Sequence, residues 1–233
     1  MLNLSQNFWK KYFKTYDILN KAIPYQDLLN LVIKKLPQSD KYKILDLGSG
    51  TGNLSIKLKK IGYDVYSLDN SQVGLTLHLM KDHAAKIYLY DLNKKLPFED
   101  NYFDIIISLN TICFIDKKNC QKIFNDLYRI LKKDGKIIVV NLFIEFHSVE
   151  IFLLHIKNYL QIYGFFKMLN ELIILAIPII KMFYFTLKLQ KIRKITFFKE
   201  YEQQKYLRNA KFINISNNEF VFAKQAILNE ANK

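Results

Sequence analysis

The chain has 233 residues, half of them hydrophobic and 15% aromatic. This length and composition suit one packed domain with a substantial core, and they exclude a disordered chain. With 35 Lys and Arg against 21 Asp and Glu, the formal net charge is +14. Such a balance favours contact with a polyanion, either nucleic acid or an anionic membrane surface. The two cysteines and four histidines have no metal-ligand spacing, so we expect no metal. No apolar signal segment opens the chain, so we expect a cytoplasmic protein.

Two helices are predicted at the start of the chain. Phe8, Tyr12 and Tyr16 recur at every fourth position, which places their rings on one helical face. After Pro24 a second apolar stripe runs from residue 28 to residue 36, and the loop 37–40 ends it. We interpret residues 1–38 as an N-terminal helical cap.

Strands and helices alternate from residue 40 to residue 142, which we interpret as a cofactor-binding core. Short apolar runs predict five strands, at 43–47, 64–68, 86–90, 103–108 and 136–141. Helical spacing predicts helices over 54–61, after Ser71, and over 118–131. Alternation of this kind implies a parallel sheet with helices on both faces.

The pattern changes after the fifth strand. Residues 144–198 form a predicted apolar helical insertion, placed where a lid, a membrane anchor or a dimer interface would lie. Residues 199–226 predict a last helix and two strands, at 212–215 and 219–223, whose four-residue connection requires an antiparallel pair. The expected fold is therefore a single α/β domain with a Rossmann-like, doubly wound, seven-stranded sheet. The sheet is mostly parallel, and its last strand is antiparallel.

A glycine-rich turn is the strongest chemical signal. The sequence Asp46-Leu-Gly-Ser-Gly-Thr-Gly52 follows the first strand and opens a helix, where glycine lets the backbone approach a ligand closely. A dinucleotide fingerprint would place glycine at position 53, which is Asn53 here. This spacing disfavours a nicotinamide dehydrogenase.

Acidic residues follow the next two strands. Asp69, directly after the second strand, can accept hydrogen bonds from both hydroxyls of a ribose. Asp91 and Leu92 follow the third strand and could reach an adenine. Because ligands bind at the carboxyl ends of strands in open α/β sheets, the three carboxylates point to one nucleoside site.

The residues 40–142 resemble class I S-adenosylmethionine-dependent methyltransferases. The resemblance rests on Ile44–Gly52, on Asp69, on Asp91-Leu92 and on the segments 96–104 and 131–136. It implies S-adenosylmethionine as cofactor, with S-adenosylhomocysteine as product. The residues that it assigns to the cofactor are Asp46, Gly48, Ser49, Gly50, Gly52, Asp69, Asn70, Asp91, Leu92, Leu109 and Asn110.

The entry segment narrows the resemblance. Tyr16-Asp-Ile-Leu-Asn20, followed by a basic amphipathic helix, is similar to the start of ubiquinone/menaquinone-biosynthesis C-methyltransferases of the type 11-like group. The first helix would then lie over the cofactor, where the rings of Tyr12 and Tyr16 could contact the sulfonium. The same aromatic stripe would also suit packing against the sheet.

Candidate catalytic residues are few. Methyl transfer requires a base only if the attacking atom must lose a proton. His147, which follows the fifth strand, is the candidate base, and Tyr16 is the second candidate; a solvated loop histidine is the alternative for His147.

The insertion predicts the acceptor. Lys167, Glu171 and Lys181 divide its apolar runs, so we expect no run of the roughly 18–20 residues that span a bilayer. The basic cluster Lys188, Lys191, Arg193 and Lys194 follows, which suits a segment lying on an anionic membrane. We therefore expect a small lipophilic or membrane-associated acceptor, such as a quinone precursor or lipid, and a location on the inner face of the membrane.

Two alternatives stay open from the residues. The basic charge prompts an RNA or DNA methyltransferase, although Ser108–Cys113 lacks the proline typical of base-modifying enzymes and nucleic acid is not the expected partner. A catalytically silent cofactor-binding protein would keep the same glycine turn. The acceptor atom and the oligomeric state are open.

Overall fold

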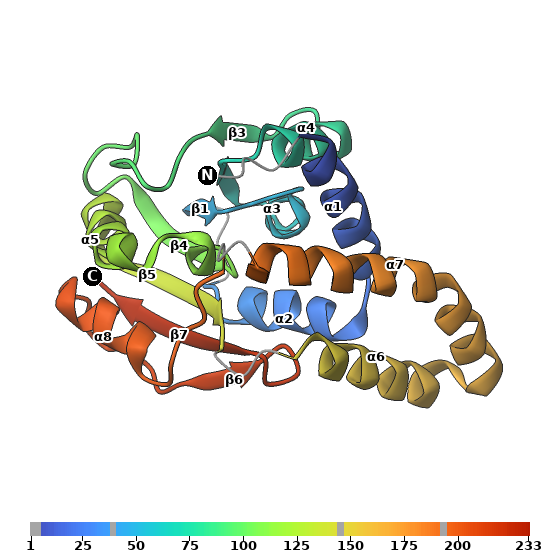
Figure 1. The fold of residues 1–233 in the computed structure, drawn as a ribbon. Coiled ribbons are helices and arrows are strands. Elements are labelled where there is room, and N and C mark those ends of the chain that lie inside the picture. The colour runs from blue at the N-terminus through green and yellow to red at the C-terminus, as the bar shows by residue number, and fades with distance from the viewer. Residues whose placement is uncertain (1–5, 38–40, 144–146, 192–194) are drawn as a thin grey trace.

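The computed structural model describes residues 6–37, 41–143, 147–191 and 195–233. In this part of the chain one seven-stranded sheet has the order β3-β2-β1-β4-β5-β7-β6 (Figure 1). The strands are β1 (Lys43–Leu47), β2 (Asp64–Asp69), β3 (Lys86–Leu89), β4 (Phe103–Leu109), β5 (Leu131–Leu142), β6 (Glu219–Val221) and β7 (Ala226–Asn232). The first five pair in parallel and β7 runs antiparallel between β5 and β6. The predicted fold class is confirmed.

The crossover helices lie on both faces of the sheet. They are α3 (Asn53–Ile61), α4 (Gln72–Lys81) and α5 (Cys120–Ile130), and α8 (Glu202–Asn209) packs beside α5. The chain moves outward from β1 to β3 through α3 and α4, and in the opposite direction from β4 to β5 through α5. Since parallel crossovers are right-handed, α3 and α4 cover one face and α5 covers the other. As predicted, the Ser71 hydroxyl caps α4 by accepting from the Gly74 amide.

The core consists of the strands and the helix faces that meet them. Ile44, Leu45 and Leu47 of β1 are fully buried, as are Ile106 and Ile107 of β4. A strand that is buried on both faces has a nearly continuous apolar sequence. These two strands could therefore be predicted although apolar and polar residues do not alternate along them.

The end of the sheet differs from the prediction. The segment 212–215 is no strand, because only Ile213 bridges to Asn232. The true hairpin joins β6 to β7 through residues 222–225, and three of them, Phe222, Ala223 and Lys224, have positive φ. β7 was missed because the polar Asn229 and Asn232 interrupt its apolar run. Asn229 is nevertheless buried, and its side chain bonds Gln203 and the backbone at Ser216.

Two N-terminal helices flank the sheet. They are α1 (Gln6–Leu19) and α2 (Ile23–Lys34). α2 packs into the main core through Leu28, Leu29 and Val32, whereas α1 packs against α4 and α7.

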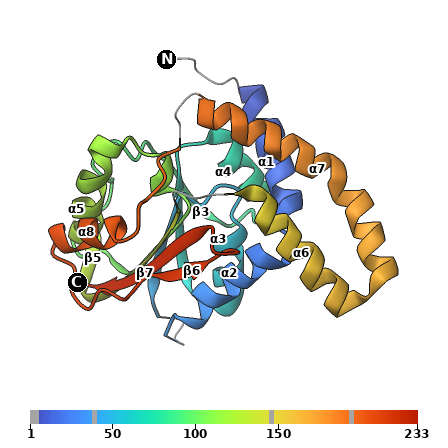
Figure 2. The same cartoon turned by 60° about the horizontal axis from the view of Figure 1, so that its bottom comes forward.

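The insertion is a helical hairpin of α6 (Ser148–Tyr163) and α7 (Phe165–Lys191). It extends away from the sheet in both views, with α7 beside α1 (Figures 1 and 2). The expectation that charges limit its apolar length is wrong. Lys167, Glu171 and Lys181 lie within one continuous helix, and the stretch Phe165–Leu189 is long and apolar enough to cross a membrane by length and composition. Arg193 and Lys194 of the predicted basic cluster lie outside the described residues.

Candidate cofactor site

The glycine turn between β1 and α3 requires its glycines. Gly48, Gly50 and Gly52 have φ values of 78°, 53° and 79°, in the left-handed region. A Cβ on Gly48 would lie 1.9 Å from Thr111 Oγ1, and a Cβ on Gly52 would lie 2.1 Å from His78 Cδ2. The turn is thus held between the segment after β4 and helix α4.

Two buried carboxylates flank this turn. Asp69 Oδ2 accepts from the Gly50 amide and its Oδ1 from the Ser71 amide, both at 2.8 Å. Each oxygen keeps a second lone pair for a ligand hydroxyl. Asp46, on β1, accepts from the Ser55 hydroxyl at 2.5 Å. Burial raises the pKa of Asp46 to about 7, and the charge of Asp69 adds to the rise while the Ser55 hydrogen bond opposes it.

Unpartnered polar atoms supply a test of whether a polar ligand fits. Ser49 Oγ and Asn110 Oδ1 are buried, and neither has a hydrogen-bond partner among the described residues. Buried polar groups are rarely left unpaired, because each lost hydrogen bond costs about 1–3 kcal/mol. Ser49 belongs to the glycine turn and Asn110 follows β4, so both lie at the carboxyl edge with Asp46 and Asp69. These residues fit a ligand that carries polar groups.

Helix α1 covers the turn. The Phe13 ring lies 3.6 Å from where a Cβ on Gly50 would stand. Asp17 Oδ1 accepts from the Thr51 hydroxyl and, at 3.3 Å, from the side-chain amide of Asn53. Its Oδ2 pairs with Lys81 Nζ at 2.8 Å. A single carboxylate therefore joins α1 to the glycine turn and to α4.

Comparison with known proteins identifies the core. A family model described as a methyltransferase domain matches residues 45–139, which include the glycine turn and both buried carboxylates. Residues 45–139 thus match a methyltransferase domain.

Relatives and solved structures agree with this assignment. A carboxy-S-adenosyl-L-methionine synthase of Nautilia profundicola is 34% identical over 51% of this chain and 53% of its own length. A ubiquinone/menaquinone biosynthesis C-methyltransferase of Blochmanniella floridana is 31% identical over 59% of this chain and 58% of its own. The chain thus spans little more than half the length of the curated relatives it matches. The crystal structure of a SAM-dependent methyltransferase of Thermotoga maritima, 18% identical, has the same fold with a TM-score of 0.65, covering 98% of this chain and 100% of that one.

The other predicted cofactor residues follow the carboxyl ends of the strands of the sheet. Leu92 is buried, Leu109 ends β4, and Asn70 is exposed directly after Asp69. Asp91 is exposed, and its Oδ1 accepts from the backbone and side-chain amides of Asn93 at 2.9 Å. This turn contact holds the pKa of Asp91 below its usual value. Contact of Asp91 with adenine stays a prediction.

The two candidate catalytic residues lie apart in the sequence and differ in environment. His147 is exposed at the start of α6, where its backbone amide donates to Gln225 Oε1. Tyr16 packs on Tyr12 at 5.9 Å and edge-on against Tyr25 at 6.1 Å. Burial raises the pKa of Tyr16 well above its usual value, which keeps its phenol protonated at neutral pH. A base role for His147 and a sulfonium contact for Tyr12 and Tyr16 stay predictions.

Sequence reasoning missed the contacts that hold the turn from outside. Asp17 is 34 residues from Thr51, which it contacts; His78 is 26 residues from Gly52, and Thr111 is 63 residues from Gly48. Asp17 stands inside the entry segment that carried the family resemblance, which was the one available signal. His78 gave none, since a buried histidine on an apolar helix face reads as ordinary core.

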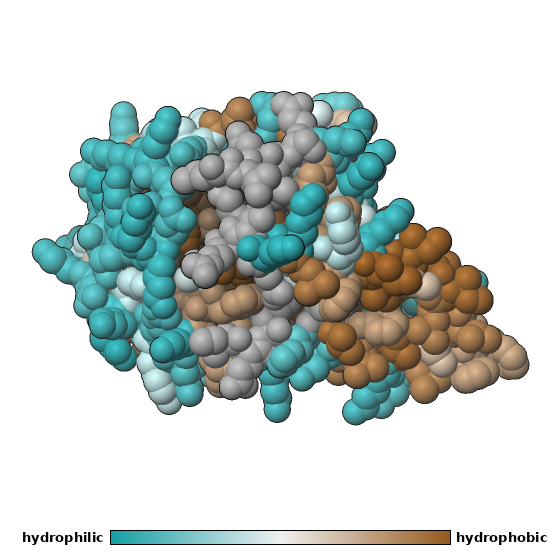
Figure 3. Space-filling model, viewed as in Figure 1, coloured by the Kyte–Doolittle hydropathy of each residue, from teal (hydrophilic) through white to brown (hydrophobic). Residues whose placement is uncertain are grey.

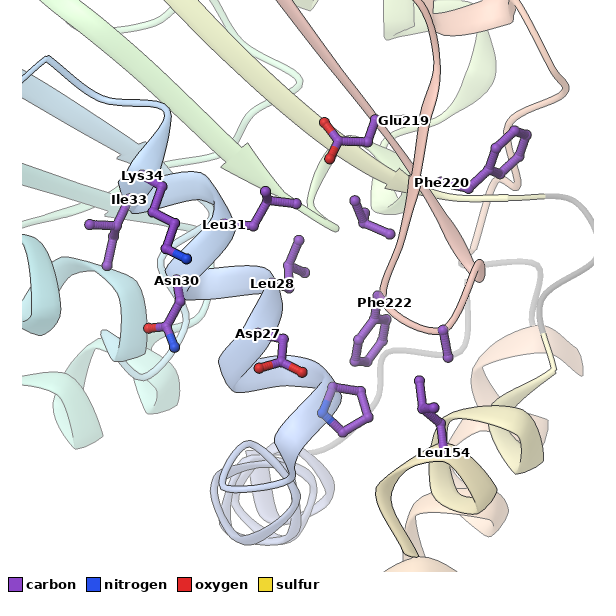
Figure 4. A pocket seen from close by; sticks show the side chains of 13 residues that line it. Asp27, Leu28, Asn30, Leu31, Ile33, Lys34, Leu154, Glu219, Phe220 and Phe222 are labelled. Atoms are coloured by element: carbon purple, nitrogen blue, oxygen red, sulfur yellow. The ribbon is translucent and has the colours of Figure 1, made fainter. Parts of the chain in front are cut away.

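A groove of about 660 Å³ lies away from the glycine turn, between α2 and the β6–β7 hairpin (Figure 4). Leu28 and Leu31 line it from α2, Phe220 and Phe222 from the hairpin, and Leu154 from α6. It holds none of the predicted cofactor residues.

Proposed function

We propose that the chain transfers a methyl group from S-adenosylmethionine to a small lipophilic acceptor. The observation that carries the transfer is the pair of buried carboxylates, Asp46 and Asp69, at the glycine turn of a methyltransferase domain. The relatives named above include a C-methyltransferase of quinone biosynthesis, which supports the acceptor class.

The chain's own residues have separate roles in this proposal. Bound S-adenosylmethionine supplies an electrophilic methyl group on a cationic sulfur. Asp69 would bind the ribose hydroxyls. The unpartnered oxygens of Ser49 and Asn110 would form hydrogen bonds with other polar groups of the cofactor. Asp46, at the end of β1, would favour the cationic part of the ligand. Helix α1 would exclude water from the reacting atoms through Phe13 and its neighbours, so that the acceptor and the methyl group are aligned.

The lipophilic acceptor rests on the hairpin. α7 packs against α1 through Phe185 and Leu189, in a cluster with Phe8. The helix that covers the cofactor turn is therefore in direct contact with the most apolar segment of the chain. An acceptor that partitions into an apolar phase would reach the site along this contact.

Calorimetry with S-adenosylmethionine and S-adenosylhomocysteine tests the cofactor. Native protein should bind both, and Asp69→Ala should weaken binding at least about tenfold, because a bidentate carboxylate hydrogen bond contributes roughly 1.5–3 kcal/mol. Asp64→Ala is the matched control, since Asp64 starts the same strand and pairs with Lys86 at the surface. Equal loss in both variants, or no binding by native protein, would overturn the proposal.

Radiolabelled methyl transfer tests the acceptor. Lipid extracts should be labelled by native protein and not by Asp69→Ala. Labelling of RNA or DNA instead of lipids would replace the lipophilic acceptor with nucleic acid and leave the cofactor assignment intact.

A further inference from the structure

Exposed apolar side chains concentrate on the α6–α7 hairpin. Among the described residues 24 large apolar side chains are exposed, and 15 of them lie between Val149 and Leu187. They form the brown surface that projects from the molecule in Figure 3. Phe166, next to the hairpin turn, is 85% exposed. Single exposed apolar residues are normal on a protein surface, but a contiguous apolar patch marks a contact with a partner or a membrane.

Helix α7 has two apolar faces. Met168, Leu175, Phe185 and Leu189 are buried against the rest of the chain. Ile173, Ile177 and Ile180 are exposed on the opposite side. The first face accounts for the folding of the hairpin onto α1 and α6, and the second has no such role. Each Å² of apolar surface in contact with water costs about 25 cal/mol, so burial of this face against another apolar surface is favourable.

Basic residues border the exposed face. Lys167, Lys181 and Lys188 are separated by 14 and 7 residues, and positions seven apart nearly superpose on a helix. The three lysines therefore follow one edge of α7. The Nζ of Lys188 lies 5.1 Å from the centre of the Phe8 ring, which places it where α7 meets α1.

The acidic residues of the hairpin are turned to internal partners. Residues 148–191 contain five lysines and two glutamates. Glu171 Oε1 lies 3.4 Å from Nε2 of the buried His155, and Glu150 accepts from Gln225 Nε2 at 2.5 Å. Both glutamates are thus held by neighbours, and the apolar surface is bordered by positive charge.

We propose that the exposed face of the α6–α7 hairpin docks on an anionic lipid bilayer. An apolar face edged by lysines has the chemistry of an interfacial helix, in which the apolar side chains enter the headgroup region and the lysines contact anionic headgroups. The hairpin lies on the bilayer and does not cross it. A crossing would require α7 to leave Phe8 and the other residues of α1 that Phe185 and Leu189 contact. This inference goes beyond the proposed methyl transfer and does not need it.

Vesicle flotation of the purified full chain tests the docking. Native protein should float with vesicles of phosphatidylcholine containing 30 mol% phosphatidylglycerol and much less with phosphatidylcholine alone. Because each lysine near an anionic surface contributes roughly fivefold, the double variant Lys167→Gln/Lys181→Gln should bind roughly 25-fold more weakly. The variant Ile173→Ser/Ile177→Ser should lose binding to both kinds of vesicle.

The matched control lies on α3. Ile61 and Lys60 are exposed there, so Lys60→Gln/Ile61→Ser removes the same chemistry elsewhere and should leave flotation unchanged. Thermal unfolding of each variant checks that it is folded.

Equal binding by hairpin and control variants would overturn docking by the hairpin. So would a native dimer that Ile173→Ser/Ile177→Ser makes monomeric, since a second copy would then cover the face. Protein that resists extraction by high salt and alkali would establish a crossing helix and contradict docking at the surface. None of these readouts involves the cofactor, so the methyl-transfer proposal can fail independently.

Discussion

Asp46 combines burial with a position at the cofactor turn. Burial raises its pKa from 3.8 to about 7, so the folded protein holds a proton that the unfolded chain releases between these two values. Folding is then favoured by this group at low pH, and that contribution is lost as the pH rises through about 7.

Replacement of this carboxyl gives the first prediction at the residue scale. Asp46→Asn has no titratable group at this position, so the stability of the variant should depend less on pH. The free energy of unfolding of the variant should therefore rise relative to that of the native protein as the pH rises from 5 to 8. The slope of the difference is at most about 1.4 kcal/mol per pH unit. Thermal unfolding of both proteins across this range measures the difference, in which the titration of groups that do not interact with Asp46 cancels. A constant difference would show that Asp46 titrates normally.

Residue-level chemistry was predictable where it follows local sequence. The glycines, Asp46 and Asp69 stand at the ends of two buried apolar runs, and their spacing alone places them together. Their hydrogen bonds were not predictable, since the partners of Asp69 and the contacts of Gly48 and Gly52 come from other elements.

At the element scale, α1 is joined to the cofactor turn by one carboxylate. Asp17 accepts from Thr51 and Asn53 of the turn and pairs with Lys81 of α4. Aromatic contacts also hold α1 here, with Phe13 near Gly50 of the turn and Tyr16 edge-on against Tyr25 of α2. The position of the helix over the turn should therefore depend on this side chain.

Removal of Asp17 tests that dependence. Asp17→Ala should weaken S-adenosylhomocysteine binding roughly tenfold, because it removes the carboxylate that Thr51, Asn53 and Lys81 share and that joins α1 to the turn. Amide exchange in α1 should quicken while exchange in β1 and β4 is unchanged. Asp27→Ala, on the exposed side of α2, is the control and should change neither quantity. Unaltered exchange in α1 would mean that the aromatic contacts suffice to hold it.

The strands differ in how well their limits can be predicted from the sequence. β1, β2 and β4 are bounded by glycine or polar turns and are mostly apolar, so their limits were predicted to within a residue. β7 contains Asn229 and Asn232, and its partners are fixed by tertiary contacts with Gln203 and β5. A buried polar network of this kind has no signature in the periodicity of one segment.

At the scale of the whole molecule, the hairpin and the cofactor turn are connected through α1. Phe185 of α7 packs edge-on against Phe8 at 5.2 Å and against Tyr12 at 6.0 Å. The same helix carries Phe13 and Asp17, which contact the turn. The sequence placed an apolar insertion after β5, but its contact with the first helix joins segments about 170 residues apart and had no local signal.

Phe185→Ala should separate these two regions without unfolding the sheet. Loss of a buried phenylalanine costs roughly 3 kcal/mol or more, and here the cost falls on a small cluster outside the main core. Limited proteolysis should then cut the hairpin and α1 faster, while residues 45–139 resist as in the native protein. Phe183→Ala is the matched control, because Phe183 lies two positions away and is exposed. Vesicle binding by Phe185→Ala should persist, since the exposed face is intact, whereas methyl transfer to a vesicle-borne acceptor should fall. Equal proteolysis of the two variants would show that the hairpin is held by the contact of α6 with α2 and not by the contact of α7 with α1, and would remove the physical connection between the membrane-facing surface and the cofactor turn.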